Sequence, residues 1–171
     1  MEEKKLYKAM TEMNPQIYKD FYKFYFRDHY KTFNIISTTI GILLLAAAVA
    51  MYCMKFGLVW VALALWIGIM GVIYPRVSYK KTYKRVKDTK QTTRFTFYED
   101  YVTEKTSGET GDYKYSELVR AVETKNYIYL YHNETNISIV VKSEVKDNGA
   151  EGLCKLLRSK IQNYSIKKTL Q

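Results

Sequence analysis

Side chains that usually carry enzyme chemistry are scarce in this sequence. It contains 2 histidines, and His29 and His132 lie too far apart to form a metal-binding pair such as H-x-x-x-H. Gly108 and Gly111 flank a polar turn without the following Lys-Ser or Lys-Thr of a phosphate-binding loop. We therefore predict a non-enzymatic protein that has no metal or cofactor and carries both histidines on its surface.

Charged residues are absent from two long apolar runs, residues 35–54 and 58–74. A run of about 18 to 20 such residues matches the hydrocarbon thickness of a bilayer at 1.5 Å per helical residue. Two soluble core helices of this kind would need more covering chain than 171 residues provide, and a cleaved signal peptide would lie nearer the N-terminus. The sequence predicts a transmembrane helical hairpin over residues 33–75. No Asp, Glu, Lys, Arg or His lies inside either span, so the usual marker of an ion pathway is missing, which argues against a transporter or channel formed by the monomer.

Basic residues flank this hairpin on both sides, whereas its turn carries only Lys55. The positive-inside rule then places both termini in the cytoplasm and the turn outside. Because these flanks explain the formal net charge of +10, we expect no nucleic-acid partner. Cys53 and Cys154 would lie on opposite sides of the bilayer and could not form a disulfide, and Cys154 is expected to be a small buried apolar residue.

Residues 1–32 form the predicted cytoplasmic N-terminal segment. Asn14 followed by Pro15 is typical of a helix start. Aromatic and charged residues then share residues 16–32 at helical spacing, which predicts an amphipathic helix at the membrane interface. Packing of its aromatic face on the cytoplasmic domain is the alternative. The stretch before Asn14 is compatible with one strand or with a frayed helix.

Pro75 is expected to end the second span, and residues 76–90 to form a basic juxtamembrane linker. Each basic residue near an anionic leaflet can contribute about 1 kcal/mol of attraction. The candidates for binding lipid headgroups are Arg76, Lys80, Lys81, Lys84 and Arg85. Alternatively, these charges only fix the topology.

Alternation with a period of two begins at Gln91 and predicts about six short strands joined as an antiparallel meander. The expected strands are residues 93–98, 101–106, 112–115, 118–124, 127–131 and 137–141. Apolar residues at helical spacing after Gly149 predict a C-terminal helix that covers one face of the sheet. The predicted fold class is a membrane α-helical hairpin plus a cytoplasmic α+β domain over residues 91–163, followed by a loose tail over residues 164–171.

Three groups of residues give the chain a family resemblance. They are residues 17–22 (Ile-Tyr-Lys-Asp-Phe-Tyr), residues 74–75 (Tyr-Pro), and a C-terminal set at residues 95–102, 115–118 and 122–131. This layout resembles the YcxB-like family of small bacterial membrane proteins. The resemblance implies a bacterial plasma-membrane location and a pleckstrin-homology-like (PH-like) domain, a bent sheet closed by a C-terminal helix. It implies no substrate or cofactor.

Two positions depart from the family pattern. Tyr115 stands where such proteins usually have Trp, and Val141-Lys142 stands where they have Pro-Lys. Both are structural positions, so neither departure removes an active site.

The favoured hypothesis is a hairpin that anchors a PH-like interaction module at the inner leaflet, where it binds a protein partner or copies of itself. The exposed row Tyr127, Tyr129 and Tyr131 is the candidate partner contact, because tyrosine is favoured in binding surfaces. Packing of this row on the C-terminal helix or on the helix at residues 16–32 is the alternative. The other hypotheses are binding of anionic membrane lipids, for example in resistance to a membrane-active peptide, and an accessory subunit of a larger membrane complex.

Overall fold

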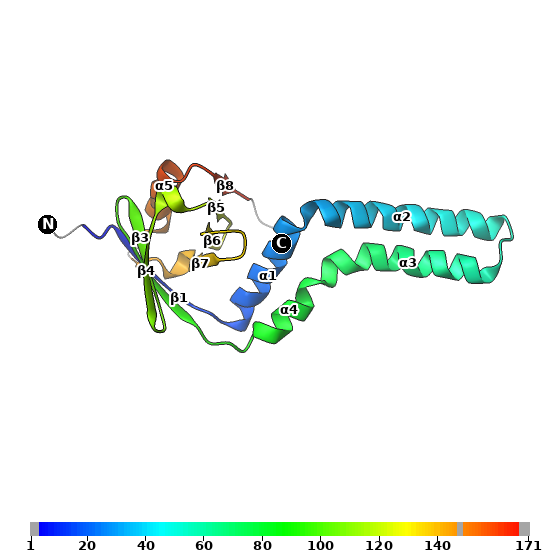
Figure 1. Ribbon diagram of the computed structural model, residues 1–171, viewed down its shortest axis with the longest axis horizontal. Helices are drawn as coiled ribbons and strands as arrows, with labels where there is room; N and C mark the ends of the chain where they lie inside the picture. Colours follow the sequence, from blue (N-terminus) through cyan, green and yellow to red (C-terminus); the bar gives the residue numbers. More distant parts are fainter. Residues whose placement is uncertain (1–3, 147–148, 168–171) are drawn as a thin grey trace. The chain divides into compact units, whose positions relative to one another are not determined.

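Two compact units make up the chain. The computed structural model describes residues 4–146 and 149–167. Unit 1 comprises residues 1–13 and 90–171, and unit 2 comprises residues 14–89. Unit 2 is therefore inserted in the sequence between the first strand of unit 1 and the rest of that unit (Figure 1).

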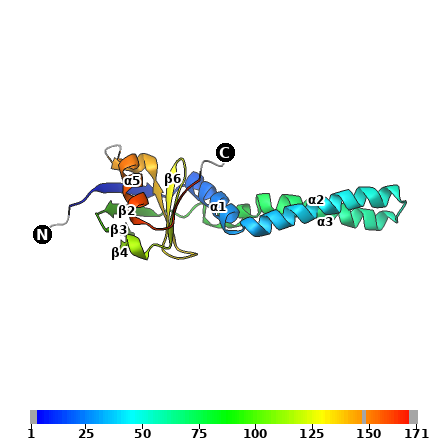
Figure 2. The same ribbon diagram turned by 90° about the horizontal axis from the view of Figure 1, so that it is seen from above.

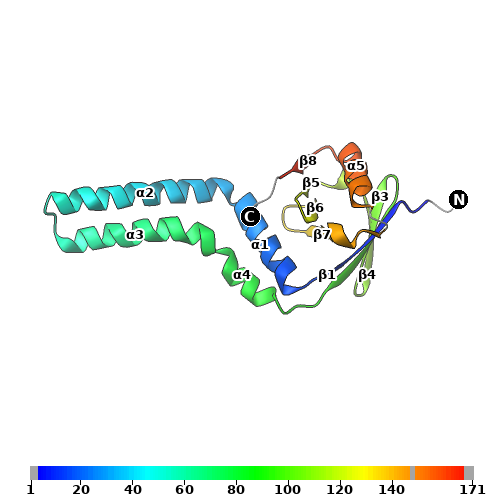
Figure 3. The same ribbon diagram turned by 180° about the vertical axis from the view of Figure 1, so that it is seen from behind.

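Unit 2 is entirely helical. Its helices are α1 (Pro15–His29), α2 (Lys31–Cys53), α3 (Leu58–Val77) and α4 (Tyr79–Val86). The antiparallel helices α2 and α3 lie side by side, and α1 lies beside α4, as Figures 1 and 3 show from opposite sides and Figure 2 from above. Both α2, with 23 residues, and α3, with 20, are long and apolar enough to cross a membrane. The predicted pair of apolar helices is confirmed.

The start of α1 follows the sequence signal. Asn14 is the N-cap, and its Oδ1 accepts a hydrogen bond from the backbone N–H of Ile17 over 2.9 Å. Pro15 occupies the first turn, where its missing N–H has no cost. The amphipathic helix expected after Asn14 is therefore present.

Glycine allows a close approach of α2 and α3. Gly41 and Gly68 are both buried, and a Cβ on Gly41 would lie 2.8 Å from the carbonyl oxygen of Gly68. A Cβ on Gly68 would lie 2.9 Å from the side chain of Leu45. Small residues four positions apart, Ser37 and Gly41 on α2 and Ala64 and Gly68 on α3, thus lie where the helices meet, as is common between membrane helices.

The end of the second apolar helix differs from the prediction. Pro75 lies inside α3, which continues to Val77, and α4 begins two residues later at Tyr79. The proline removes one backbone donor but does not end the helix. Helix α3 is interrupted only at Ser78, its C-cap. Most of the predicted linker over residues 76–90 is therefore helical.

Unit 1 contains two four-stranded sheets and a helix. Sheet A has the order β1-β2-β3-β4 and sheet B the order β7-β6-β5-β8. The strands are β1 (Tyr7–Glu12), β2 (Thr92–Phe97), β3 (Tyr101–Thr106), β4 (Glu109–Lys114), β5 (Arg120–Glu123), β6 (Tyr127–Tyr131), β7 (Ile137–Val141) and β8 (Tyr164–Ile166). Neighbouring strands are antiparallel except β5 and β8, which are parallel. Helix α5 (Ala150–Lys160) precedes β8, and short 3-10 turns follow β4 and β7.

Six of these strands, β2 to β7, confirm the predicted ones, and α5 confirms the predicted helix. The single meander is wrong, because the strands divide into two sheets. The first strand, β1, joins sheet A by pairing with β2 from Tyr7↔Phe97 to Glu12↔Thr92. The expected loose tail over residues 164–171 is also wrong at its start, where Tyr164–Ile166 pairs with β5, while residues 168–171 lie outside the described residues.

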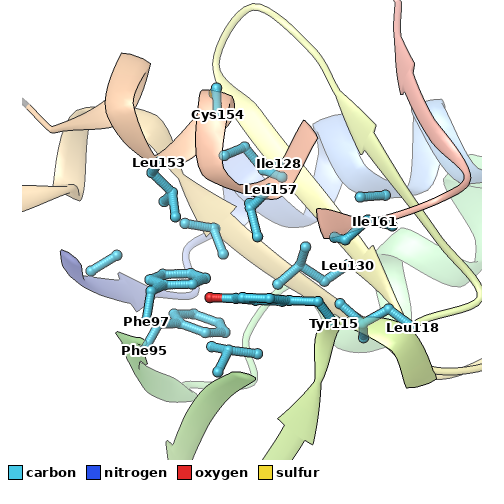
Figure 4. Close-up of a cluster of buried hydrophobic side chains, with 14 of the residues drawn as sticks. Phe95, Phe97, Tyr115, Leu118, Ile128, Leu130, Leu153, Cys154, Leu157 and Ile161 are labelled. Atoms are coloured by element: carbon cyan, nitrogen blue, oxygen red, sulfur yellow. The ribbon is translucent and has the colours of Figure 1, made fainter. Parts of the chain in front are cut away.

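Both sheets and α5 contribute side chains to one core (Figure 4). Leu153 and Leu157 of α5 are fully buried, and Phe97 comes from sheet A. Tyr115 lies across the middle of the cluster, and its hydroxyl donates a hydrogen bond to the carbonyl of Tyr98 over 2.8 Å. Burial raises the pKa of Tyr115. An aromatic ring with a satisfied polar tip thus fills the middle of this core.

Candidate functional site

Unit 2 contains a groove of about 660 Å³. Residues of α1, the start of α2, the end of α3 and the start of α4 line it. Its lining contains four cationic side chains and no acidic one: Lys23, Arg27, Lys31 and Arg76. We call this cavity the basic groove.

Three of the four cations come from one run of sequence. Lys23 and Arg27 lie four residues apart on one face of α1, and Lys31 follows four residues later as the first residue of α2. Arg76 arrives from the far end of the hairpin on α3, and its guanidinium donates a hydrogen bond to the carbonyl of Val72. The fold of unit 2 is what brings the two sets together.

The electrostatics of the groove favour an anion. No ion pair of the described residues involves any of its four cations. Burial lowers the pKa of Arg27 by desolvating its guanidinium. Four like charges around one cavity repel each other, and an anion bound among them would remove this repulsion.

Beyond its charged end, the groove is lined by uncharged side chains, both polar and apolar. Asn34, Thr38 and Thr39 line it along α2, and the Asn34 side-chain amide donates a hydrogen bond to the carbonyl of Phe26 over 3.3 Å. Ile35 adds apolar surface to the same lining. The cavity therefore runs from the cationic side chains along the first turns of the apolar helix α2.

The structure places only one predicted lipid-binding residue in this groove, namely Arg76. Lys80, Lys81, Lys84 and Arg85 are exposed on α4 and do not line it. Lys23, Arg27 and Lys31 were missed as site residues. Their four-residue spacing was visible, but it was interpreted only as the polar face of a helix.

The exposed tyrosine row expected in sheet B is wrong for two of its three residues. Tyr127 is half-buried, but Tyr129 is 1% and Tyr131 2% exposed. Their strand, β6, is the inner strand between β5 and β7, and its alternate residues on both faces are buried. The guanidinium of Arg120 lies 3.9 Å from the Tyr131 ring centroid. A partner contact remains a prediction, and the accessible part of it is Tyr127.

A second polar cluster joins the two sheets of unit 1. His132 Nε2 lies 3.0 Å from Ser138 Oγ and 3.2 Å from Glu104 Oε1, and Ser138 Oγ donates to Glu104 Oε2 over 2.5 Å. The side chains of His132 and Glu104 are 8% and 9% exposed, so the prediction that His132 is a surface residue is wrong. Serine and glutamate meet the same ring nitrogen, whereas a catalytic triad needs the acid on the other one. The cluster is therefore best described as a buried hydrogen-bonded link between the two sheets.

Glu123 is the centre of a third cluster. Its carboxylate accepts hydrogen bonds from Tyr164 over 2.6 Å, Lys142 over 2.7 Å and Arg158 over 3.2 Å. Burial acts to raise the pKa of Glu123, but these donors outweigh burial and lower the pKa to about 2. The cluster ties β5 to α5 and β8. Cys154 lies in the core beside it, as predicted, and burial raises the pKa of that thiol.

Comparison with protein families identifies part of unit 1. Residues 97–153 match the family model described as YcxB-like protein. The YcxB-like resemblance predicted from the sequence is confirmed over this segment. No curated protein and no solved structure gave a significant match.

The YcxB-like segment runs from the end of β2 into α5. It contains Tyr115, Glu123 and His132, whereas the basic groove lies outside it. Among residues 4–146 and 149–167, no group of three or more His, Cys, Asp or Glu side chains is placed to hold a metal ion. The basic groove is therefore the best candidate for a ligand site.

Proposed function

We propose that this YcxB-like protein is a non-enzymatic integral protein of the bacterial plasma membrane, with both termini in the cytoplasm, that anchors a PH-like interaction module at the inner leaflet. The pairing of β1 with β2 is the observation that carries the proposal. Met13 donates its backbone N–H to the carbonyl of Gln91 over 2.8 Å, so the segments before and after the hairpin meet in one sheet. Segments on opposite sides of a bilayer could not do so.

The charge pattern supports the cytoplasmic side for unit 1. Basic residues flank α2 and α3 at the ends that continue into unit 1, while the turn between them carries only Lys55. The positive-inside rule favours this orientation. The aromatic residues of α1 then belong at the headgroup level of the inner leaflet.

The PH-like assignment rests on architecture. A PH-like domain closes its bent sheets with a C-terminal helix, and α5 contributes Leu153 and Leu157 to the core shared by both sheets here. Such a module functions by binding. A protein partner, a second copy of this chain or a larger membrane complex would meet the exposed surface of unit 1, which includes part of Tyr127.

Cysteine labelling tests the topology. Cys53 is exposed at the end of α2 beside the turn, whereas Cys154 is buried. A membrane-impermeant maleimide should label Cys53 in spheroplasts, and Cys53→Ser should abolish the labelling. Ser107→Cys, in the exposed turn between β3 and β4 and combined with Cys53→Ser, should react only after permeabilisation. Reaction of Ser107→Cys in intact spheroplasts would contradict the proposal.

Proximity crosslinking from native membranes tests the interaction module. The intact protein with a cytoplasmic C-terminal tag should recover one dominant protein partner or a crosslinked copy of itself. Tyr127→Ser should reduce this recovery, and Ser107→Ala, in the exposed turn between β3 and β4, is the matched surface control. Recovery of neither a protein partner nor a second copy would exclude this form of the function.

Binding of the anionic leaflet is the second candidate function, with protection against a membrane-active peptide as one outcome. Lys80, Lys81, Lys84 and Arg85 are all exposed on α4 and carry no acidic neighbour on that helix. Such a collar gives diffuse attraction that salt weakens. Cells that carry Lys80→Ala/Lys84→Ala should survive a cationic peptide less well than wild-type cells if this function operates, and unchanged survival would exclude it.

A further inference from the structure

We infer that the basic groove is a binding site for one molecule of an anionic phospholipid, whose phosphate lies among Lys23, Arg27, Lys31 and Arg76. This site is distinct from the diffuse attraction of the α4 collar because it has a fixed position and a stoichiometry of one. It rests on the insertion of α2 and α3 into a membrane.

The charged end of the groove has the chemistry of a phosphate site. Arginine presents a planar fork of donors that matches phosphate oxygens, and lysine adds a point charge. The groove offers two of each, and no acidic side chain of the described residues forms an ion pair with them. Arg27 is half-buried, so its guanidinium is partly desolvated, and no described side chain forms an ion pair with it. An anion bound there would therefore be attracted more strongly than on an open surface.

The depth of the groove distinguishes a lipid from a free anion. Lys31 is the first residue of α2, and Thr38 and Thr39 lie about 10 to 12 Å further along the helix at 1.5 Å per residue. A bilayer passes from headgroups into hydrocarbon over a comparable distance, since the polar regions add roughly 5 to 8 Å on each side. A free phosphate would use only the charged end.

The uncharged lining fits the middle of a phospholipid. Thr38 and Thr39 carry hydroxyl groups that can donate to the ester oxygens of a glycerol backbone. Ile35 and Pro75 offer apolar surface to the first part of an acyl chain. The groove therefore combines the charged, polar and apolar side chains that the phosphate, the ester groups and the acyl chains of one lipid molecule require.

The size of the groove also suits a single ligand molecule. Its volume of about 660 Å³ lies within the range of roughly 300 to 1,000 Å³ that is usual for ligand sites. All of its lining residues belong to unit 2, so the site needs no residue of unit 1.

Native mass spectrometry of the full-length protein in a neutral detergent tests the site. Phosphatidylglycerol and phosphatidylcholine with identical acyl chains are titrated separately. We expect one phosphatidylglycerol per protein and weaker binding of phosphatidylcholine. Arg27→Ala/Lys31→Ala should weaken phosphatidylglycerol binding about 25-fold, because each lost cation removes roughly a fivefold factor.

The matched control removes the same charge outside the groove. Lys80→Ala/Lys84→Ala should change the affinity of the detergent-solubilised protein by less than the groove variant does. An equal loss in both variants would overturn the fixed site in favour of the diffuse collar. Equal binding of both lipids would also overturn it.

Two further experiments test whether the ligand is a lipid or a free phosphate ester, and whether the lipid lies along α2. Glycerol 3-phosphate should not displace phosphatidylglycerol, and displacement at equimolar concentration would assign the groove to a soluble phosphate ester. Thr38→Leu keeps every charge but replaces a hydroxyl in the uncharged lining, and it should weaken binding; full affinity in this variant would overturn the seating of the lipid along α2. The cysteine labelling of Cys53 reports insertion separately, so failure of the anchor and failure of the lipid site are distinguishable.

Discussion

Ser37 on α2 donates its hydroxyl to the carbonyl oxygen of Gly71 on α3 over 3.1 Å. In an unbroken helix this carbonyl would accept the backbone N–H four residues later, but that position is Pro75, which has no N–H. The hydroxyl of one helix therefore satisfies the acceptor that the proline of the other leaves without its donor. Unsatisfied backbone groups are costly in a bilayer, so this bond allows Pro75 inside α3.

Gly41→Leu should separate α2 from α3. A Cβ at Gly41 already falls 2.8 Å from the Gly68 carbonyl, so the larger side chain forces the helices apart. We expect a loss of about 1 to 3 kcal/mol, as for other overpacked contacts. Unfolding in detergent, followed by the fluorescence of Trp60 and Trp66, measures it. The exposed Ala47→Leu is the matched control and should leave stability unchanged; equal effects in both variants would contradict the close contact.

Replacing residues 14–89 with a short Asn-Gly turn should yield a soluble, folded unit 1. Glu12 and Thr92 are paired at the ends of β1 and β2, so a short turn can close the hairpin directly. Cooperative thermal unfolding, followed by circular dichroism, is the measurement. Residues 90–171 alone should fail to unfold cooperatively, because they lack β1 and the bond from the Thr11 hydroxyl to the Ile139 carbonyl. A fragment without β1 that unfolds as cooperatively as the full unit would refute this.

The stability of that soluble unit should fall in acid because of Glu123. Its folded pKa of about 2 lies below the ordinary value of 4.5, so the stabilisation is present above pH 4.5 and is lost as the pH falls towards 2. The loss amounts to about 3 kcal/mol at most. Urea unfolding of wild type and Glu123→Gln across this range measures the difference, which should shrink as the pH falls. A difference that stays constant down to pH 2 would show that the network does not hold the carboxylate ionised.

His132→Phe should destabilise unit 1 more than the change of both partners does. The single change leaves the buried Glu104 without the histidine at 3.2 Å and with only the Ser138 hydroxyl. We expect a cost of about 3 kcal/mol. The combination Glu104→Leu/His132→Phe removes both polar groups and should recover part of this loss. A double-mutant cycle by urea unfolding gives the coupling, and purely additive effects would exclude an energetic link between the two side chains.

Local patterns were sufficient for most elements of this fold. The apolar helices α2 and α3 and strands β2 to β7 follow from missing charge and from period-two alternation, which are properties of neighbouring residues. Strand β8 was missed, and β1 was only one of two alternatives for its segment, because each pairs with residues far along the chain. Alternation also cannot distinguish a half-exposed strand from one buried on both faces, which is why Tyr129 and Tyr131 were wrongly expected at the surface.

The basic groove could not be predicted for a related reason. Lys23 and Arg76 lie on either side of the hairpin in the sequence, and only the return of α3 and the packing of α4 on α1 bring them to one cavity. A sequence pattern identifies each charge as part of a flank. It does not tell which flanking charges face the same space.

The pairing of β1 with β2 makes the order of synthesis part of the fold. The ribosome releases β1 before the hairpin and β2 only after it, so sheet A must wait until both apolar helices have been made. In the proposed topology, a chain that inserted only one of them would leave the two strands on opposite faces of the bilayer, with their edges unpaired. Under the proposed topology, completion of the sheet would report correct insertion, and chains with an incomplete sheet would remain open to proteolysis in the cell.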